Sequence, residues 1–219
     1  MSTVLSHQEA RRVYNRIGSL QDWQAFYEDR ATDVLVRQGD FGSAEAVFEF
    51  GCGTGRFALR LLTEFLSANS HYRGVDVSPK MISLAQAHLA PYSSRAQVVL
   101  TEGEPPVGEP AESCDRFVSN YVFDLLSEED IRAVLTEARR MLRQEGLLCL
   151  ASLSTGVGPL SRSVASVWHW IQAHRPSVVG GCRPLELLAF LPASAWQVRH
   201  HAKLVAFGIT SEVLIAQRC

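Results

Sequence analysis

Apolar residues along the central part of the chain follow two spacings that alternate. Short apolar runs predict five strands, at 44–50, 71–77, 95–101, 114–120 and 147–153. Between them, apolar side chains recur every three or four residues, which predicts helices that begin at about residue 56, after Ser78 and after Ser127. Strands that alternate with helices predict a parallel sheet with helical crossovers.

The two ends of the chain depart from this alternation. Residues 7–38 have a helical pattern, interrupted at Gly18 and Ser19. After residue 155 the pattern predicts one or two helical stretches, at 158–174 and 184–191. Two alternating segments then flank Gly208, at 195–207 and 209–216, and predict an antiparallel hairpin at the edge of the sheet.

These patterns predict a single domain over residues 1–219, without internal repeats or long linkers. Its parts are a helical N-terminal extension (1–40), a core (45–153), a helical insertion (155–194) and a C-terminal hairpin (195–217).

Local signals support several of the predicted boundaries. Ser78 is a favourable N-cap, and Pro79 suits the first turn of a helix. Ser127 followed by Asp130 resembles a capping box with Asp in its third place. Gly146 is expected to end the helix that this box starts, just before the fifth strand.

Composition and charge narrow the class of protein. The 219 residues are 47% hydrophobic and 20% charged, with a formal net charge of −2 and no run of basic residues. We therefore expect no nucleic-acid partner. The sequence shows no signal-peptide pattern and no apolar stretch of about 18 residues, so we expect a cytoplasmic protein without membrane association.

The histidines and cysteines do not predict a metal site. His169 and His174 are too far apart around a helix to share one face, and His200 and His201 point to opposite sides of a strand. The five cysteines are scattered, without a CxxC pair, and are expected to be free thiols.

The most informative segment is the turn that follows the first predicted strand. It reads VFEFGCGTG (47–55), with Gly51 and Gly53 where backbone can approach a ligand closely. The following helix presents free N–H groups there. Glu49 ends the strand, and Asp76 ends the next one, where an acid can accept hydrogen bonds from ribose hydroxyls. The pattern predicts a site for a ribose-containing molecule.

This pattern does not by itself choose the molecule. The dinucleotide fingerprint GxGxxG would place its third glycine at position 56, which is Arg56, whereas the glycine stands at Gly55. A pyrophosphate is thereby disfavoured. A NAD(P)-dependent oxidoreductase on a Rossmann sheet stays open as an alternative.

The segments VFEFGCGTG (47–55) and GVDVSPKMI (74–82) resemble the first two cofactor motifs of class I S-adenosylmethionine-dependent methyltransferases. The resemblance continues through DRFVSNYVFDLLS (115–127) and RQEGLLCL (143–150), and covers residues 45–153. It implies an α/β fold, a three-layer Rossmann-like sandwich. Its seven-stranded sheet would be mostly parallel, with an antiparallel C-terminal hairpin. The implied cofactor is S-adenosyl-L-methionine.

The resemblance also implies roles for individual residues. On its terms, Gly51, Cys52 and Gly53 pass beneath the methionine part of the cofactor, and Glu49 orients the loop or the amino group. Asp76 binds the ribose, and Val77 and Met81 contact adenine. Asn120 and Tyr121 lie beside the methionine moiety and the methyl group, and Tyr14 closes over the cofactor.

The sequence departs from the family's pattern after the third strand. The Asp that often binds the adenine amino group is absent, and Glu102 or the backbone around Gly103 is expected to replace it. No catalytic base is assigned. Asp124 is a candidate, but a structural role in its turn is favoured.

The resemblance implies methyl transfer to a small-molecule acceptor, selected by the parts outside the core. The extension and the insertion carry aromatic residues that could form a lid, namely Tyr14, Trp23, Phe26, Tyr27, Trp168 and Trp170. The acceptor atom and the oligomeric state stay open. Besides an oxidoreductase, a cofactor-binding subunit without catalysis remains an alternative.

Overall fold

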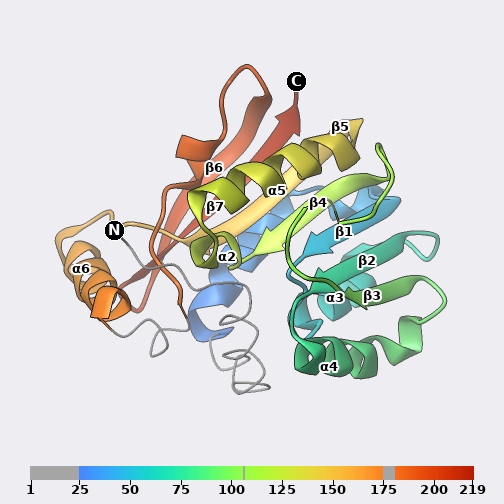
Figure 1. Cartoon of the computed structure of the whole chain (residues 1–219), viewed down its shortest axis with the longest axis horizontal. Helices are drawn as coiled ribbons and strands as arrows, with labels where there is room; N and C mark the ends of the chain where they lie inside the picture. The colour runs from blue at the N-terminus through green and yellow to red at the C-terminus, as the bar shows by residue number, and fades with distance from the viewer. Residues whose placement is uncertain (1–24, 106, 175–180) are drawn as a thin grey trace.

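A seven-stranded sheet forms the centre of the protein (Figure 1). The computed structural model describes residues 25–105, 107–174 and 181–219. Across the sheet the strands follow the order β3 (Ala96–Leu100), β2 (His71–Asp76), β1 (Ala46–Phe50), β4 (Cys114–Asn120), β5 (Leu142–Leu153), β7 (Ile209–Arg218) and β6 (Trp196–Ala206). Strands β1 to β5 are parallel, whereas β7 is antiparallel to both β5 and β6. The predicted fold class is confirmed.

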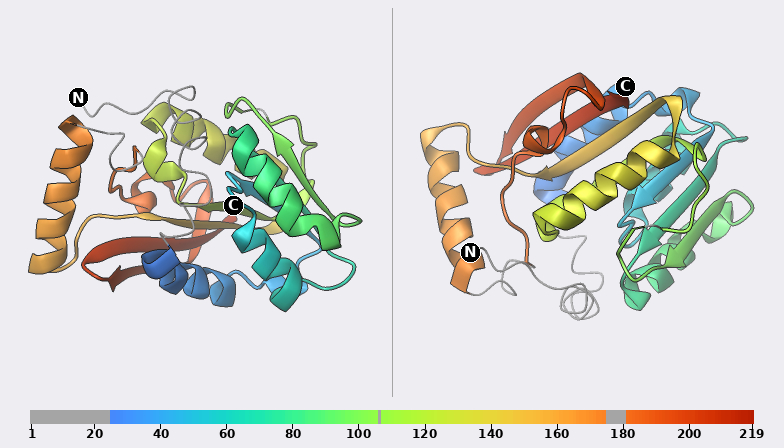
Figure 2. Two further views of the ribbon diagram at one scale, coloured as in Figure 1. Left: turned by 90° about the horizontal axis from the view of Figure 1, so that it is seen from below. Right: turned by 45° about the horizontal axis from the view of Figure 1, so that its top comes forward.

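Helices cover both faces of this sheet (Figure 2). The helices are α2 (Ala25–Gln38), α3 (Arg56–Arg60, continued by a π-helical turn at Leu61–Phe65), α4 (Pro79–Leu89), α5 (Glu128–Met141) and α6 (Pro159–His174). One apolar cluster joins α2, α3 and the end of α4 to alternate residues of the central strands, such as Val47 and Val118. A second cluster joins α5 to residues on the other face, such as Phe48 and Phe117. Alternation along each strand thus supplies two cores.

The predicted helix starts are confirmed in detail. The Ser78 hydroxyl accepts a hydrogen bond from Met81 N at 3.2 Å, with Pro79 in the first turn of α4. The Ser127 hydroxyl accepts one from Asp130 N at 3.0 Å at the start of α5. These contacts satisfy N–H groups that have no partner inside the helix.

The fifth strand corrects the predicted boundary. It begins at Leu142, directly after α5, and Gly146 lies inside it rather than ending the helix. Cys114 pairs with Leu142 and Arg116 with Leu147, so an irregularity takes up the extra residues. Gly146 suits this place because a Cβ there would lie 2.9 Å from Leu142 Cδ2.

The insertion and the N-terminal region differ in part from the expectation. Only a 3-10 turn, Leu187–Phe190, forms where a second helical stretch was expected. Pro184 and Pro192 bound that segment, and the N–H groups of Leu187 and Leu188 donate to the Glu212 carboxylate rather than within a helix. Helix α2 matches the end of the predicted 7–38 pattern, whereas the expected interruption at residues 18–19 lies outside the described residues.

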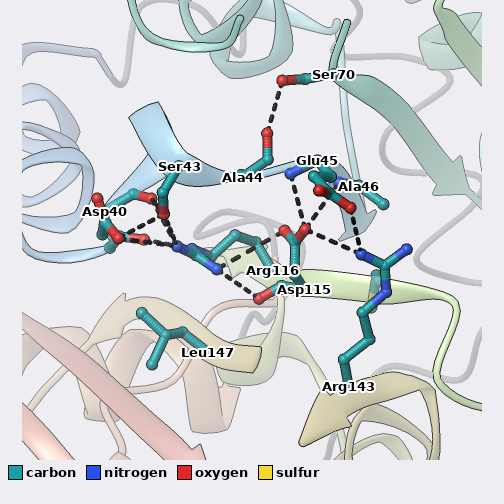
Figure 3. A network of polar contacts seen from close by, with 12 residues as sticks. Asp40, Ser43, Ala44, Glu45, Ala46, Ser70, Asp115, Arg116, Arg143 and Leu147 are labelled. Carbon is teal, nitrogen blue, oxygen red and sulfur yellow. Dashed lines mark hydrogen bonds and ion pairs between the residues drawn. The ribbon is translucent and has the colours of Figure 1, made fainter. Parts of the chain in front are cut away.

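A buried arginine holds the connection from α2 to β1 by hydrogen bonds (Figure 3). It lies at the amino ends of the parallel strands, which we call the amino edge of the sheet. Arg116 of β4 donates from Nε to Gly39 O at 2.6 Å, and from Nη2 to Asp40 O at 2.6 Å and Ser43 Oγ at 2.8 Å. The neighbouring Asp115 accepts from the N–H groups of residues 45 and 46, at 2.7 and 3.1 Å. This network fixes where β1 enters the sheet.

Among the described helices, none is both long enough and apolar enough to cross a membrane.

Candidate cofactor site

The turn after β1 brings backbone very close to its neighbours, which explains its glycines. Gly51 has a φ of +80°, and a Cβ there would lie 2.3 Å from Val122 Cγ2. The N–H groups of Gly51 and Cys52 both donate to Val75 O, at 2.8 and 2.9 Å. The turn is therefore bonded to the end of β2, and Val122 packs against Gly51 so closely that only glycine fits there.

Gly55 allows a close packing contact. In the dinucleotide fingerprint GxGxxG, the third glycine has this role, and it would stand at position 56. Its φ is +78°, and a Cβ would lie 3.0 Å from the Cβ of Ala85 in α4. Helix α3 begins at the next residue, Arg56, which is exposed and pairs with Asp29 of α2. The close contact between the turn and α4 thus uses position 55, and Arg56 does not disturb it.

Asp76 is tied into the glycine turn. Its Oδ2 accepts a hydrogen bond from Gly53 N and its Oδ1 one from Ser78 N, both at 2.9 Å. Burial raises the pKa of this carboxyl group, although the backbone N–H bonds oppose the shift. Asp76 therefore not only ends β2 but also supports the glycine turn. Carboxylate oxygens accept more than one hydrogen bond, so capacity for ribose hydroxyls is left.

Glu49 lies beside this turn at the end of β1 and is 2% exposed. Its Oε2 accepts a hydrogen bond from the Tyr72 hydroxyl at 2.5 Å, and its Oε1 one from Asn120 Nδ2 at 3.4 Å. Burial raises the pKa of Glu49 to about 7, and the nearby Asp76 adds to the rise. A cationic group brought next to Glu49 would lower that pKa again.

Asn120 offers the clearest vacant hydrogen-bonding capacity in the site. Its amide nitrogen donates to Glu49, whereas its buried Oδ1 has no hydrogen-bond partner among the described residues. A buried acceptor of this kind is costly unless a ligand satisfies it. Asn120 and Glu49 together fit an ammonium group.

Tyr121 points away from its neighbour Asn120. It has a φ of +54°, which is unusual for a residue other than glycine. Its hydroxyl lies 2.8 Å from Ser211 Oγ of β7, and its ring packs against a small cluster that includes Leu153 and Cys182. Asn120 thus faces the glycine turn, while Tyr121 forms part of the wall below the insertion.

The residues expected around adenine lie on the other side of the turn. Met81 is buried in α4 and Val77 is half-buried after β2. Gly103 is buried with a φ of +91°, whereas the Glu102 side chain is exposed. The contacts of these four residues with adenine stay predictions. Tyr14 lies outside the described residues.

The structure adds residues that the sequence analysis did not place in the site. Tyr72 of β2 donates a hydrogen bond to Glu49. The sequence indicated this role only in that a tyrosine occupies an inward position of a central strand, where its hydroxyl group needs a partner. Val122 closes the turn at Gly51. Asp124 is 0% exposed, and Arg183 N donates to its carbonyl oxygen at 2.9 Å.

Comparisons with known proteins agree with this arrangement. The family described as "Methyltransferase domain" matches residues 47–146. An uncharacterized methyltransferase of Bacillus subtilis, YrrT, is 31% identical over 143 residues, 56% of this chain and 60% of that protein. A carboxy-S-adenosyl-L-methionine synthase of Mannheimia succiniciproducens is 31% identical over 127 residues, 57% of this chain and 52% of that protein. The chain thus spans little more than half the length of these curated relatives.

Solved structures share the fold over almost the whole chain. The [4+2]-cyclase SpnF has a TM-score of 0.74 at 15% identity, covering 98% of this chain and 97% of its own. The N-methyltransferase NodS from Bradyrhizobium japonicum, solved with S-adenosyl-L-homocysteine, has a TM-score of 0.70 at 17% identity, covering 95% and 98%.

Residues 47–146 are therefore similar to a methyltransferase domain, which agrees with the resemblance of the motifs at 47–55 and 74–82. A geranyl diphosphate methyltransferase with the same fold, at a TM-score of 0.65 and 13% identity, was solved in complex with SAM. The comparisons lend no support to a nicotinamide-dependent oxidoreductase or to a subunit without catalysis.

Proposed function

We propose that this protein transfers the methyl group of S-adenosylmethionine to a small-molecule acceptor. The observation that carries the proposal is the convergence of Glu49, Asp76 and Asn120 on the glycine turn, at the carboxyl ends of three neighbouring strands. Ligands bind at this edge of open α/β sheets.

Each of these residues has a distinct task in the proposal. Glu49 and Asn120 Oδ1 receive the ammonium group of the cofactor, and Asp76 receives its ribose hydroxyls. The backbone of the turn at Gly51 and Gly53, both with positive φ, borders the chain of atoms between them. When bound, the cofactor supplies an electrophilic methyl group.

The protein then has mainly to orient an acceptor atom and exclude water, since positioning alone can contribute up to about 7–11 kcal/mol. A dedicated base is needed only where the acceptor must lose a proton. None of the residues in this proposal is assigned that task.

Charge and architecture support a small acceptor rather than a macromolecule. The net charge is −2 and no basic run occurs along the sequence. The solved structures that match nearly the full chain include a geranyl diphosphate methyltransferase, whose named substrate is a small molecule. We accordingly propose a cytoplasmic enzyme that acts on a soluble metabolite, with α6 on the acceptor side.

Cofactor binding is tested by thermal unfolding with S-adenosylhomocysteine or with NAD⁺. We expect the melting temperature to rise with S-adenosylhomocysteine alone, because a ligand that binds only the native state stabilises it. Glu104→Ala, an exposed loop acid near the site, is a matched control that keeps the rise, whereas Asp76→Ala loses most of it. If millimolar S-adenosylhomocysteine leaves the melting temperature of folded wild-type protein unchanged, the proposal is contradicted.

Methyl transfer is tested with trideuteromethyl-labelled S-adenosylmethionine and a mixture of small organic acids, phenols, amines and isoprenoids. Mass spectrometry should find the labelled methyl group on a small molecule only with active protein. Label found on added peptide or RNA instead would reject the small-acceptor part. Tight cofactor binding without any labelled product across the mixture would favour the non-catalytic alternative.

A further inference from the structure

A tyrosine of β2 reaches the cofactor site by lying over a glycine of its own strand. Across the parallel pair of β1 and β2, Val47 stands opposite Tyr72 and Glu49 stands opposite Gly74. These positions share one face of the sheet, because alternate residues of a strand point to the same side. Since Gly74 has no side chain, the ring of Tyr72 can extend along β2 as far as Glu49.

Two neighbours fill the space beside Gly74. A Cβ at Gly74 would lie 2.7 Å from the Tyr72 hydroxyl oxygen, 2.8 Å from the Cβ of Cys52 and 3.1 Å from its Sγ. Because these distances are too short for a Cβ, a larger residue would push away the hydroxyl or the glycine turn that carries Cys52. Gly74 thus allows the Tyr72 hydroxyl and the turn to meet at the end of β1.

The hydrogen bond from Tyr72 decides which oxygen of Glu49 is left for a ligand. The hydroxyl donates to Oε2 at 2.5 Å, and both residues are buried. Asn120 Nδ2 donates to Oε1 at 3.4 Å, which is long for a hydrogen bond. The Asn120 Oδ1 has no partner among the described residues. Glu49 Oε1 and Asn120 Oδ1 are therefore neighbouring acceptors that one cationic ligand can use together.

The surroundings also decide which group holds the proton. Burial raises the pKa of Tyr72 well above its usual value, and the nearby Glu49, Cys52 and Asp76 add to the rise. The hydroxyl therefore keeps its proton and donates it to Glu49 Oε2. A donor at this oxygen favours the ionised form of Glu49, which is the form that binds a cation.

On the basis of the proposed function, we propose that Tyr72 is a positioning residue for the amino-acid end of S-adenosylmethionine. Its hydrogen bond holds Glu49 with Oε1 beside Asn120, so that the ammonium group of the cofactor meets two acceptors at once. Gly74 provides the room for this arrangement. The site thereby selects the complete cofactor over shorter thioethers of adenosine that lack the amino-acid end.

Tyr72→Phe tests this role, because phenylalanine keeps the ring in its apolar cluster and removes only the hydroxyl group. Calorimetry compares S-adenosylhomocysteine with 5′-methylthioadenosine, which has the same adenosine and thioether sulfur but no amino-acid end. The variant should bind S-adenosylhomocysteine roughly 5- to 30-fold more weakly and 5′-methylthioadenosine as tightly as wild type does. Tyr92→Phe, which removes a hydroxyl paired with Thr63 in the turn before β3, is the matched control and should change neither affinity.

Two further measurements show whether Tyr72 acts through Glu49. In a Glu49→Gln background, Tyr72→Phe should change S-adenosylhomocysteine affinity by less than about threefold, because the carboxylate that it positions is gone. The affinity of wild-type protein should fall as the pH drops through about 7, where Glu49 takes up a proton. Tyr72→Phe raises the pKa of Glu49 further, so its affinity should fall at a higher pH. The other titratable groups near Glu49, Asp76 and Cys52, are the same in both proteins.

The outcomes separate this inference from the proposed function. Equal weakening of both ligands in Tyr72→Phe would show that the hydroxyl shapes the glycine turn and does not position Glu49 for the ammonium group. Unchanged S-adenosylhomocysteine affinity would show that Glu49 needs no positioning. Either result overturns the inference and leaves methyl transfer standing. If the wild-type protein binds neither ligand, the proposed function fails together with the inference.

Discussion

The parallel strands bury charged groups at both of their ends. The amino ends form the amino edge of the sheet and the carboxyl ends form its carboxyl edge, and the buried groups at these two edges differ in how fully their hydrogen bonds are satisfied. At the amino edge, the Arg116 side chain is only 6% exposed, and its N–H groups donate to Gly39 O, Asp40 O and Ser43 Oγ (Figure 3). At the carboxyl edge, burial raises the pKa values of Glu49, Asp76 and Asp124. The Asn120 amide oxygen there lacks a partner among the described residues.

This difference separates stability from function. Groups whose hydrogen bonds are complete inside the protein hold the fold together and gain nothing from a ligand. Groups with shifted pKa values and spare acceptor capacity are stabilised further when a ligand arrives, which is typical of functional sites. The same sheet therefore has a structural edge and a binding edge. Three substitutions test this contrast, and a fourth tests the turn between β6 and β7.

Arg116→Ala should have the largest effect and should act on stability alone. It leaves the carbonyl groups of residues 39 and 40 without their donor, and removing one member of a buried charged network costs about 3–5 kcal/mol. Urea unfolding should show this loss, while calorimetry finds unchanged S-adenosylhomocysteine affinity in the folded fraction. Arg143→Ala, a half-exposed member of the same network, should cost less than about 1 kcal/mol. Similar losses of unfolding free energy in the two variants would show that Arg116 is no more important to stability than Arg143.

Glu49→Gln should change how stability depends on pH. The pKa of Glu49 is about 7 in the folded protein and about 4.5 when unfolded, so ionisation destabilises the fold as the pH rises between these values. A shift of this size corresponds to about 3 kcal/mol. The difference between the unfolding free energies of wild type and variant should therefore change by about 3 kcal/mol in total between pH 4 and pH 8. Parallel curves would show that Glu49 titrates normally.

Asp76→Ala should affect both binding and stability. Losing hydrogen bonds to a charged group, each worth about 1.5–3 kcal/mol, should weaken S-adenosylmethionine binding roughly 10- to 150-fold in calorimetry. Stability should also fall by about 1–3 kcal/mol, because Gly53 N and Ser78 N lose their acceptor. Glu104→Ala is the control for both measurements. Unchanged affinity would remove Asp76 from the site, whatever happens to stability.

Phe207→Asn should have the smallest effect, and in the opposite direction. Phe207 and Gly208 both have positive φ, +53° and +83°, in the turn between β6 and β7, where Asn-Gly is the favoured pair. Phe207 is also 78% exposed, so Asn should stabilise the protein by roughly 0.5–1 kcal/mol. Val205→Asn, at an exposed position within β6, should destabilise it instead. A lower melting temperature for Phe207→Asn would show that the phenylalanine does more than occupy a strained turn.

The sequence by itself determined the secondary-structure elements and their order along the chain. The alternation of short apolar runs with helical spacing gave the strands and their sequence, and capping residues located the starts of α4 and α5. The glycines at 51 and 53 and the acid at the end of β2 indicated the cofactor turn. These features depend on neighbours within a few residues, which a single sequence displays.

Only the tertiary structure decided which polar groups meet across the sheet. Tyr72 lies 23 residues from its partner Glu49, and Arg116 lies 77 residues from Gly39. In the turn after β4, the Asp124 carbonyl oxygen accepts a hydrogen bond from Arg183 N of the insertion, far along the chain. The early start of β5 likewise depends on pairing with β4. Such contacts follow from strand order and burial, and the burial that shifts a pKa comes from chain segments far apart in sequence.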